Sequence, residues 1–217
     1  MNELQLKAIV FDFDGTLADS MPFLEDIGVQ MMMKYYDVTK EDATHRYRTT
    51  TGLPYEHQIK MNFPDHPENK VAIGEFEKMK IERIFEQSLF DDTETTLKEI
   101  KTKGISIFVS SSTFQPTITE YFRRKGLLDL FDEILGYRPG FEKGADHFNH
   151  IKETYGYREQ DLVFVGDSLK DCERAKGHTQ FIALGGMFTQ EDFNKTGHYG
   201  PFVTSLSQIP SLLLPME

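Results

Sequence analysis

Short apolar runs are the clearest pattern along the chain. Each run is continuous rather than alternating with polar residues, and segments of helical spacing lie between most of them. Continuous apolar strands are typical of a parallel sheet covered by helices on both faces, so we expect an α/β core. The predicted strands are Ala8–Phe11, Ile105–Val109, Leu162–Val165 and Phe181–Leu184, with Phe202–Val203 as a weaker edge strand before a closing helix over Ser205–Leu214.

A long insert separates the first two predicted strands. More than ninety residues lie between Phe11 and Ile105, far more than a single crossover helix needs. No strand pattern is visible there, and turn-forming residues divide the segment into four helix-sized pieces, of which the last is Glu68–Leu89. We expect residues 20–89 to form a helical domain inserted into a core made by residues 1–19 and 90–217.

The composition is that of an ordinary folded protein. Apolar residues make up 39% and charged residues 27% of the 217 residues, which suits one core domain with a smaller insert. Acidic residues outnumber basic ones by 35 to 24, so the net charge is −11. Such a surface repels a phosphate backbone, and we therefore expect no nucleic-acid partner.

The sequence offers no sign of a membrane partner or of secretion. No apolar stretch approaches the ~18 residues of a membrane span. Charged residues such as Lys7 interrupt the amino-terminal segment that a secretion leader would need. Cys172 is the single cysteine, so no internal disulfide can form. We expect a soluble, cytoplasmic protein that is a monomer or a homodimer.

Two carboxylates directly follow the first predicted strand. Asp12 and Asp14 lie in the segment VFDFDGTL, at the strand end where open α/β sheets bind ligands. Because alternate residues of a strand point to opposite faces, a turn at Gly15 is needed to bring both acids around one site. Two solvated loop acids are the alternative, but the apolar strand before them favours a site.

With these residues the sequence resembles the haloacid dehalogenase-like hydrolases. The segment DFDGT, residues 12–16, is similar to the first motif of that superfamily, and three further motifs follow in the same order. Ser110 follows the second strand, Lys143 comes next, and the segment GDSLKD, residues 166–171, is similar to the acidic fourth motif. The resemblance covers residues 8 to about 184 and implies a Rossmann-like parallel sheet with a helical cap between the first two motifs.

The resemblance implies a mechanism. Asp12 would attack a phosphoryl group and form an aspartyl phosphate, while Asp14 would protonate the leaving oxygen and then activate water. The acid at Asp14 indicates a phosphatase, because the dehalogenases of the superfamily lack an acid there. Asp12, Asp167 and the backbone carbonyl of Asp14 would hold one Mg²⁺, an ion that prefers oxygen ligands.

Further matched residues would bind the phosphate. Ser110 and its neighbour Ser111 would donate to phosphoryl oxygens, although a hydroxyl here can also cap a helix. Lys143 would place its ammonium between the phosphate and the nucleophile, and Asp171 would support the metal's waters or orient Lys143. The chain departs from the family at one point, because Gly144 stands where the family often has a proline.

The resemblance also implies that the cap selects the substrate. Arg46 and Arg48 lie near the end of a predicted cap helix, before a polar loop, where an arginine could contact an anionic substrate. Two solvated arginines are the alternative. Three histidines have no predicted role, because lone histidines are more often surface or packing residues: His57, His147 and His150.

Taken together, the motifs predict a Mg²⁺-dependent phosphomonoesterase that acts on a small phosphorylated metabolite, similar to phosphoglycolate or sugar phosphatases. One alternative is a phosphomutase resembling β-phosphoglucomutase, which uses the same motifs but returns the phosphoryl group to the sugar. A second is a catalytically silent relative that binds a phosphorylated ligand. The presence of Asp12, Asp14, Lys143 and Asp167 argues against this second alternative.

Overall fold

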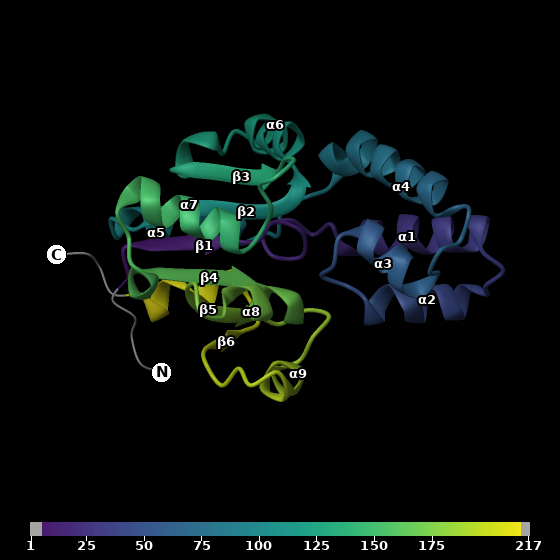
Figure 1. Ribbon diagram of the computed structural model, residues 1–217. Helices are drawn as coiled ribbons and strands as arrows, with labels where there is room; N and C mark the ends of the chain where they lie inside the picture. Colours follow the sequence, from purple (N-terminus) through teal and green to yellow (C-terminus); the bar gives the residue numbers. More distant parts are fainter. Residues whose placement is uncertain (1–5, 214–217) are drawn as a thin grey trace. The chain divides into compact units, whose positions relative to one another are not determined.

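The computed structural model describes residues 6–213 and divides the chain into two compact units (Figure 1). One unit contains the residues up to Ala18 and those from Leu89 onward, and we call it the core. The other unit is Asp19–Ser88, which we call the cap. The chain thus leaves the core once, directly after its first strand and loop, and returns once.

A six-stranded parallel sheet forms the centre of the core (Figure 1). The strands lie in the order β3-β2-β1-β4-β5-β6, and every neighbouring pair is parallel. After β3 the chain crosses to the other side of β1, so the order reverses between β1 and β4, the point where open sheets bind ligands. The predicted α/β fold is confirmed. The strands are β1 (Ala8–Phe11), β2 (Ser106–Phe114), β3 (Glu133–Tyr137), β4 (Leu162–Gly166), β5 (Gln180–Leu184) and β6 (Phe202–Val203).

The sheet differs from the prediction in β2 and β3. The sequence analysis missed β3, because Glu133 and Gly136 interrupt its apolar run. Strand β2 continues beyond Val109 to Phe114 through four hydroxyl-bearing residues. This extension of β2 stays in the sheet because Phe114 pairs with Tyr137 of β3 after a register shift. The hydroxyl-bearing segment is therefore part of the sheet edge rather than a loop.

The predicted closing helix is wrong. Two short 3₁₀ turns, Leu206–Gln208 and Pro210–Leu212, lie there instead. Pro210 has no backbone N–H to continue a helical ladder, and this breaks the segment. Leu214, at the end of the predicted helix, lies outside the described residues.

Helices cover both faces of the sheet, which explains its continuous apolar strands. Ala8 and Val10 of β1 belong to one buried cluster together with Phe148 of α7. Ile9 and Phe11 alternate with them, point to the opposite face, and are also fully buried. The helices of the core are α5 (Thr93–Thr102), α6 (Gln115–Lys125), α7 (Ala145–Tyr155), α8 (Leu169–Ala175) and α9 (Gln190–Lys195), with 3₁₀ turns at Leu128–Leu130 and Glu159–Asp161.

The cap consists of four helices followed by a 3₁₀ turn, as the turn-forming residues indicated. Helix α1 contacts both α2 and α4, and α3 contacts α4. The last helix ends at Arg83, earlier than the predicted Leu89, and the turn after it buries Ile84. The elements are α1 (Met21–Tyr35), α2 (Lys40–Thr49), α3 (Tyr55–Asn62), α4 (Asn69–Arg83) and the turn Ile84–Glu86.

Gly28 of α1 allows close packing between helices of the cap. A Cβ atom at this position would lie 2.4 Å from Cε2 of Tyr47 in α2. The hydroxyl of Tyr55 donates to the Gly28 carbonyl at 3.1 Å, and its ring stacks on Phe76 of α4 at a centroid distance of 3.7 Å. The missing side chain of Gly28 therefore lets two tyrosines pack against the backbone of α1.

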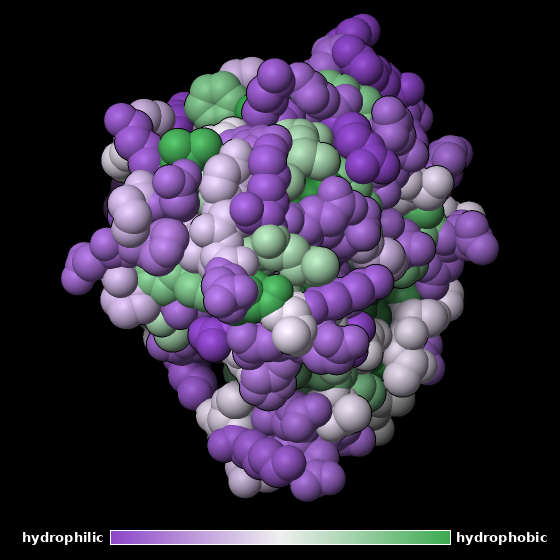
Figure 2. Space-filling model, turned by 90° about the vertical axis from the view of Figure 1, so that its right-hand side faces the viewer, coloured by the Kyte–Doolittle hydropathy of each residue, from purple (hydrophilic) through white to green (hydrophobic). Residues whose placement is uncertain are grey.

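The surface in Figure 2 is hydrophilic over most of its visible area, with small, separate apolar spots. Among residues 6–213, no helix has both the length and the apolar character needed to cross a membrane. The apolar spots on the face seen in Figure 2 are separate from one another, so this face has no broad apolar patch of the kind that marks a docking surface.

Replacing Gly28 with alanine should destabilise the cap. Crowding against Tyr47 costs about 1–3 kcal/mol, more than the ~1 kcal/mol that alanine gains over glycine within a helix. Calorimetric unfolding should give a lower midpoint for Gly28→Ala than for the parent. Gly74→Ala in α4 is the matched control, because nothing lies within 4 Å of its Cβ, and it should raise the midpoint. Equal midpoints for the two variants would show that the Tyr47 ring moves aside at no cost.

Candidate active site

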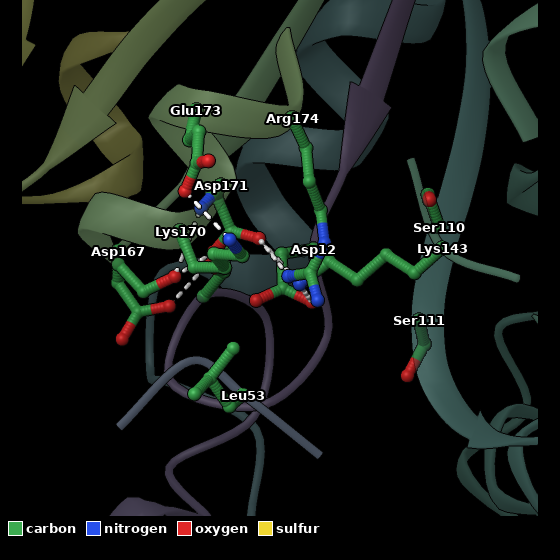
Figure 3. A network of polar contacts seen from close by, with 12 residues as sticks. Asp12, Leu53, Ser110, Ser111, Lys143, Asp167, Lys170, Asp171, Glu173 and Arg174 are labelled. Carbon is green, nitrogen blue, oxygen red and sulfur yellow. Dashed lines mark hydrogen bonds and ion pairs between the residues drawn. The ribbon is translucent and has the colours of Figure 1, made fainter. Parts of the chain in front are cut away.

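Four predicted site residues of the core come together at the carboxyl edge of the sheet (Figure 3): Asp12, Lys143, Asp167 and Asp171. Asp12 directly follows β1, Asp167 directly follows β4, and these two strands are neighbours. Asp171 lies in the first turn of α8, and Lys143 lies two residues before α7. The reversal of strand order between β1 and β4 therefore places these carboxylates beside one another.

Phe13 anchors the loop that carries the two acids of the first motif. Its ring is fully buried and packs edge-on against Tyr121 and Phe122 of α6, at centroid distances of 4.8 and 5.5 Å. The Phe13 carbonyl accepts a hydrogen bond from the backbone N–H of Ala18 at 3.0 Å. Gly15 has a φ of 80°, which closes this turn at little cost. The carboxylates on either side of Phe13 are thus held by a rigid loop.

Three buried carboxylates form a compact cluster. Oxygen atoms of Asp12, Asp167 and Asp171 all lie within 4.8 Å of one another, and each residue is at most 5% exposed. The hydroxyl of Thr16 donates to Oδ1 of Asp167 at 3.1 Å. Like charges at this separation repel strongly away from water, so the cluster needs cations.

Two cationic side chains contact the cluster (Figure 3). Lys143 Nζ lies 2.8 Å from Oδ1 of Asp12 and 2.6 Å from Oδ1 of Asp171, and its side chain is 7% exposed. Nη1 of Arg174, one turn further along α8, lies 3.4 Å from the same Asp171 oxygen. Lys143 therefore bridges the residue after β1 and the helix after β4.

The pKa values of the three carboxyl groups show that Lys143 and Arg174 do not compensate all of the negative charge in the cluster. Burial raises the pKa of Asp12 well above its usual value and raises the pKa of Asp167 to about 7, and the nearby Asp171 carboxylate adds to both shifts. Burial also acts on Asp171, but Lys143 and Arg174 outweigh it and hold the pKa of this carboxyl below its usual value. An all-oxygen cluster short of positive charge suits a hard divalent cation. The residues present thus fit a metal site.

Gly144 departs from the family pattern for a structural reason. Its φ of 112° lies in the left-handed region, whereas proline is fixed near −65°. The Cγ and Cδ atoms of Arg174 lie 3.3 Å from the place where a Cβ would stand. Lys143 thus reaches the cluster from a backbone conformation at Gly144 that proline could not adopt. The side chain of Arg174 lies beside the place where a Cβ of residue 144 would stand.

The two serines of β2 have partners of their own. Ser110 is fully buried within β2, and its Oγ lies 2.8 Å from Nδ1 of His147. Ser111 is also fully buried, and its Oγ accepts a hydrogen bond from the backbone N–H of Thr113 at 3.0 Å. Both serines thus have hydrogen-bond partners within the core, and their role as phosphate ligands stays a prediction.

Asp14 lies in a different environment from Asp12. It is only partly buried, and its carboxylate is not a member of the three-carboxylate cluster. The hydroxyl of Thr113 donates to Oδ2 of Asp14 at 3.1 Å, which ties this acid to the end of β2. The two acids of the first motif therefore have separate surroundings.

The cap arginines pair with residues of the cap itself. Arg46 Nε donates to Asp42 at 2.9 Å. Arg48 makes two hydrogen bonds of 2.8 Å to the carboxylate of Glu25, while its side chain is 59% exposed. A substrate would have to compete with these carboxylates. The predicted substrate contact of Arg46 and Arg48 stays a prediction.

Sequence reasoning missed three residues at the site: Thr113, His147 and Arg174. Arg174 follows Asp171 by three positions in a helix, so helical spacing could have revealed it. His147 follows Lys143 by four positions, but its partner Ser110 lies on another strand. Thr113 reaches Asp14 only because β2 extends beyond its apolar part. These two contacts depend on the tertiary fold.

Comparison with known proteins now assigns the chain to a family. A sequence model of the haloacid dehalogenase-like hydrolases matches residues 9–183. The chain belongs to this family. The predicted resemblance is thereby confirmed, and with it the prediction of an enzyme of the phosphatase branch.

Individual relatives are distant but cover most of the chain. A haloacid dehalogenase-like hydrolase domain-containing protein of Arabidopsis thaliana is 28% identical over 96% of this chain and 84% of its own length. A phosphoglycolate phosphatase of Aliivibrio fischeri is 24% identical over 79% of this chain and 80% of its own length. Among solved structures, a haloacid dehalogenase-like hydrolase from Bacteroides fragilis has a TM-score of 0.81 at 23% identity, covering 94% of this chain and all of that one. The likeness to the Bacteroides fragilis structure establishes the fold of this chain.

Gly144→Pro should lower activity even though it restores the family's usual residue. Proline cannot adopt the φ of 112°, so the backbone must shift and carry Lys143 away from Asp12. We expect hydrolysis of p-nitrophenyl phosphate to fall by roughly tenfold or more, since misplacing a charged group at a reacting centre can cost ~10²-fold. Gly156→Ala at the far end of α7 is the control, with a similar φ of 71° and open space around its Cβ. Parental activity in Gly144→Pro would rule out a role for this backbone in placing Lys143.

Proposed function

We propose that this hydrolase is a Mg²⁺-dependent phosphomonoesterase that acts on a small phosphorylated metabolite through an aspartyl phosphate on Asp12. One observation carries the proposal: Lys143 contacts Asp12 at 2.8 Å inside a buried cluster of three carboxylates. Two solvated surface acids require no buried lysine, because water already stabilises their charge. A carboxylate that attacks a phosphate anion requires positive charge beside it, because the two anions repel each other.

Asp12 is the proposed nucleophile. Burial favours its protonated form, and the charge and hydrogen bond of Lys143 offset only part of this effect, so a bound cation would be needed to favour the carboxylate. An ionised Asp12 oxygen can attack phosphorus and displace the alcohol, which divides the hydrolysis into two easier displacements. Lys143 remains charged, because Asp12 and Asp171 outweigh the effect of burial and raise its pKa.

Asp14 is the proposed general acid and base. It would give a proton to the departing oxygen and later take one from the water that attacks the aspartyl phosphate. Its carboxylate stands apart from the three-carboxylate cluster, and Thr113 binds one of its oxygens.

Asp12, Asp167 and the backbone carbonyl of Asp14 are the proposed metal ligands, with Asp171 holding Lys143 in place at 2.6 Å. An all-oxygen ligand set favours Mg²⁺ over softer metals. When bound, the ion would neutralise charge on the phosphoryl oxygens. Ser110 and Ser111 would donate hydrogen bonds to those oxygens.

Small phosphorylated metabolites are proposed as substrates because relatives such as the Aliivibrio fischeri enzyme are named phosphoglycolate phosphatases. A panel of small phosphomonoesters, assayed with Mg²⁺ for released phosphate, tests this directly. Turnover of a hexose monophosphate without phosphate release would instead indicate the mutase alternative.

Exchange of each acid of the first motif for its amide should separate their roles. Asp12→Asn lacks the nucleophile and should form no phosphoenzyme. Asp14→Asn keeps the nucleophile but has no acid or base, so an activated aryl or acyl phosphate should still phosphorylate it and the adduct should persist. Loss of a general acid or base typically costs ~10² to 10⁴ in rate. Acid quenching followed by mass spectrometry would locate the added mass on the peptide that contains Asp12.

The parent enzyme, quenched in the same way, is the control for this experiment. A phosphoryl mass on that peptide of Asp12→Asn, or turnover by this variant at the parent's rate, would show that Asp12 is not the nucleophile.

A further inference from the structure

Thr113 is a buried threonine near the end of β2 to which the proposed mechanism gives no step of its own. Its side chain is tied to an acid of the site, because its hydroxyl donates to Oδ2 of Asp14 at 3.1 Å. The two residues are 99 positions apart in the sequence. The hydrogen bond therefore joins the end of β2 to the loop after β1, which carries both acids of the first motif.

Strand β2 is irregular where it carries Thr113. From Ser110 to Phe114 it advances four positions, whereas the paired β3 advances two positions, from Leu135 to Tyr137. The extra residues form a bulge in β2, and bulges occur often beside active sites, where they redirect a side chain. Because a bulge interrupts the regular ladder, contacts other than strand pairing must fix the backbone of Thr113.

Gln115 and Gly136 supply these contacts. Oε1 of Gln115 accepts a hydrogen bond from the Gly136 N–H at 2.7 Å, and Nε2 donates to the carbonyl of Ile134 at 2.8 Å. The side-chain amide thus binds β3 where the backbone ladder is interrupted. A Cβ on Gly136 would lie 2.7 Å from the carbonyl oxygen of Thr113, so glycine allows the two strands to approach this closely. In addition, the N–H of Thr113 donates to Oγ of Ser111 at 3.0 Å.

We propose that Thr113 is a positioning residue that holds the carboxyl group of Asp14 in the orientation needed for proton transfer, and that Gln115 and Gly136 fix the bulge that presents it. The inference rests on the proposed function, in which Asp14 is the general acid and base. A general acid must lie within hydrogen-bond distance of the oxygen that receives its proton. A hydroxyl on a fixed strand end restrains the rotation of the carboxyl group and so favours that geometry.

Phenyl phosphates with different para substituents test this role, because they have similar shapes while the acidity of the leaving phenol varies. A weakly acidic phenol needs a proton in order to depart, whereas p-nitrophenol departs readily as an anion. Thr113→Val keeps the shape of the side chain but has no hydroxyl. It should lower kcat/KM roughly tenfold for phenyl phosphate, the equivalent of one lost hydrogen bond. For p-nitrophenyl phosphate, which depends least on the acid, the loss should be no more than about twofold.

Two further variants separate the hydroxyl from the bulge that presents it. Thr113→Ser keeps the hydroxyl and should retain most of the parent's kcat/KM for every ester. Gln115→Met has a side chain of similar length without the amide. It should lose more activity on phenyl phosphate than on p-nitrophenyl phosphate, although Thr113 is unchanged. This variant also serves for the comparison if melting curves show that Thr113→Val does not fold.

Thr179→Val is the matched control. Thr179 is also buried, and its hydroxyl also makes a hydrogen bond, to the carbonyl of Gln180 at 3.1 Å. It directly precedes β5 and therefore lies at the amino edge of the sheet, opposite to the site. Thr179→Val should keep the parent's kcat/KM for every ester, whatever its melting temperature.

The dependence on the leaving group distinguishes positioning from stability. If Thr113→Val lost the same factor on every ester, Thr113 would only stabilise the fold, and the inference would be overturned while the proposed function stood. Equal losses in Gln115→Met would overturn the part assigned to the bulge. A parent protein that hydrolysed none of the esters would overturn the proposed function and this inference with it.

Discussion

The site depends on holding three carboxylates together in a space that excludes most water. Asp12, Asp167 and Asp171 lie within 4.8 Å of one another, and burial pushes two of them toward protonation. Lys143 and Arg174 hold Asp171 ionised, and Lys143 also contacts Asp12. The remaining excess of negative charge is what makes a divalent cation part of the proposed enzyme, and the fold supplies the frame that keeps the charges in place.

That frame comes from sheet topology and a few anchored side chains. The strand order reverses between β1 and β4, so the residues that follow these strands must meet. Phe13, buried against α6, fixes the loop after β1. Gly144 turns the backbone so that Lys143 enters the cluster, while Arg174 fills the space that a side chain would need. Phe13 and Gly144 each lie next to a charged residue of the site, so packing in the core fixes the positions of those charged residues.

Local patterns in the sequence were enough to predict the parallel sheet, the helical insert and the acids after β1 and β4. These features depend on apolar runs, turn residues and spacing along the chain. Strand β3 escaped prediction because Glu133 and Gly136 break its pattern. The partnership of Ser110 with His147 escaped because it joins residues 37 positions apart on different elements. The pairing of Arg48 with Glu25 was likewise invisible, since it depends on how two cap helices pack.

Calorimetric melting of the parent protein and Asp167→Asn, with chelator and with Mg²⁺, tests the charge balance most directly. The pKa of Asp167, about 7 when folded, is above its ordinary 3.8, so its ionisation destabilises the metal-free protein as the pH rises through about 7. At pH 8 with chelator, Asp167→Asn should therefore melt above the parent. Mg²⁺ should raise the parent's melting temperature, because it binds the folded state, and should leave the variant nearly unchanged. A variant that melts lower in chelator, or a parent that Mg²⁺ does not stabilise, would contradict this account.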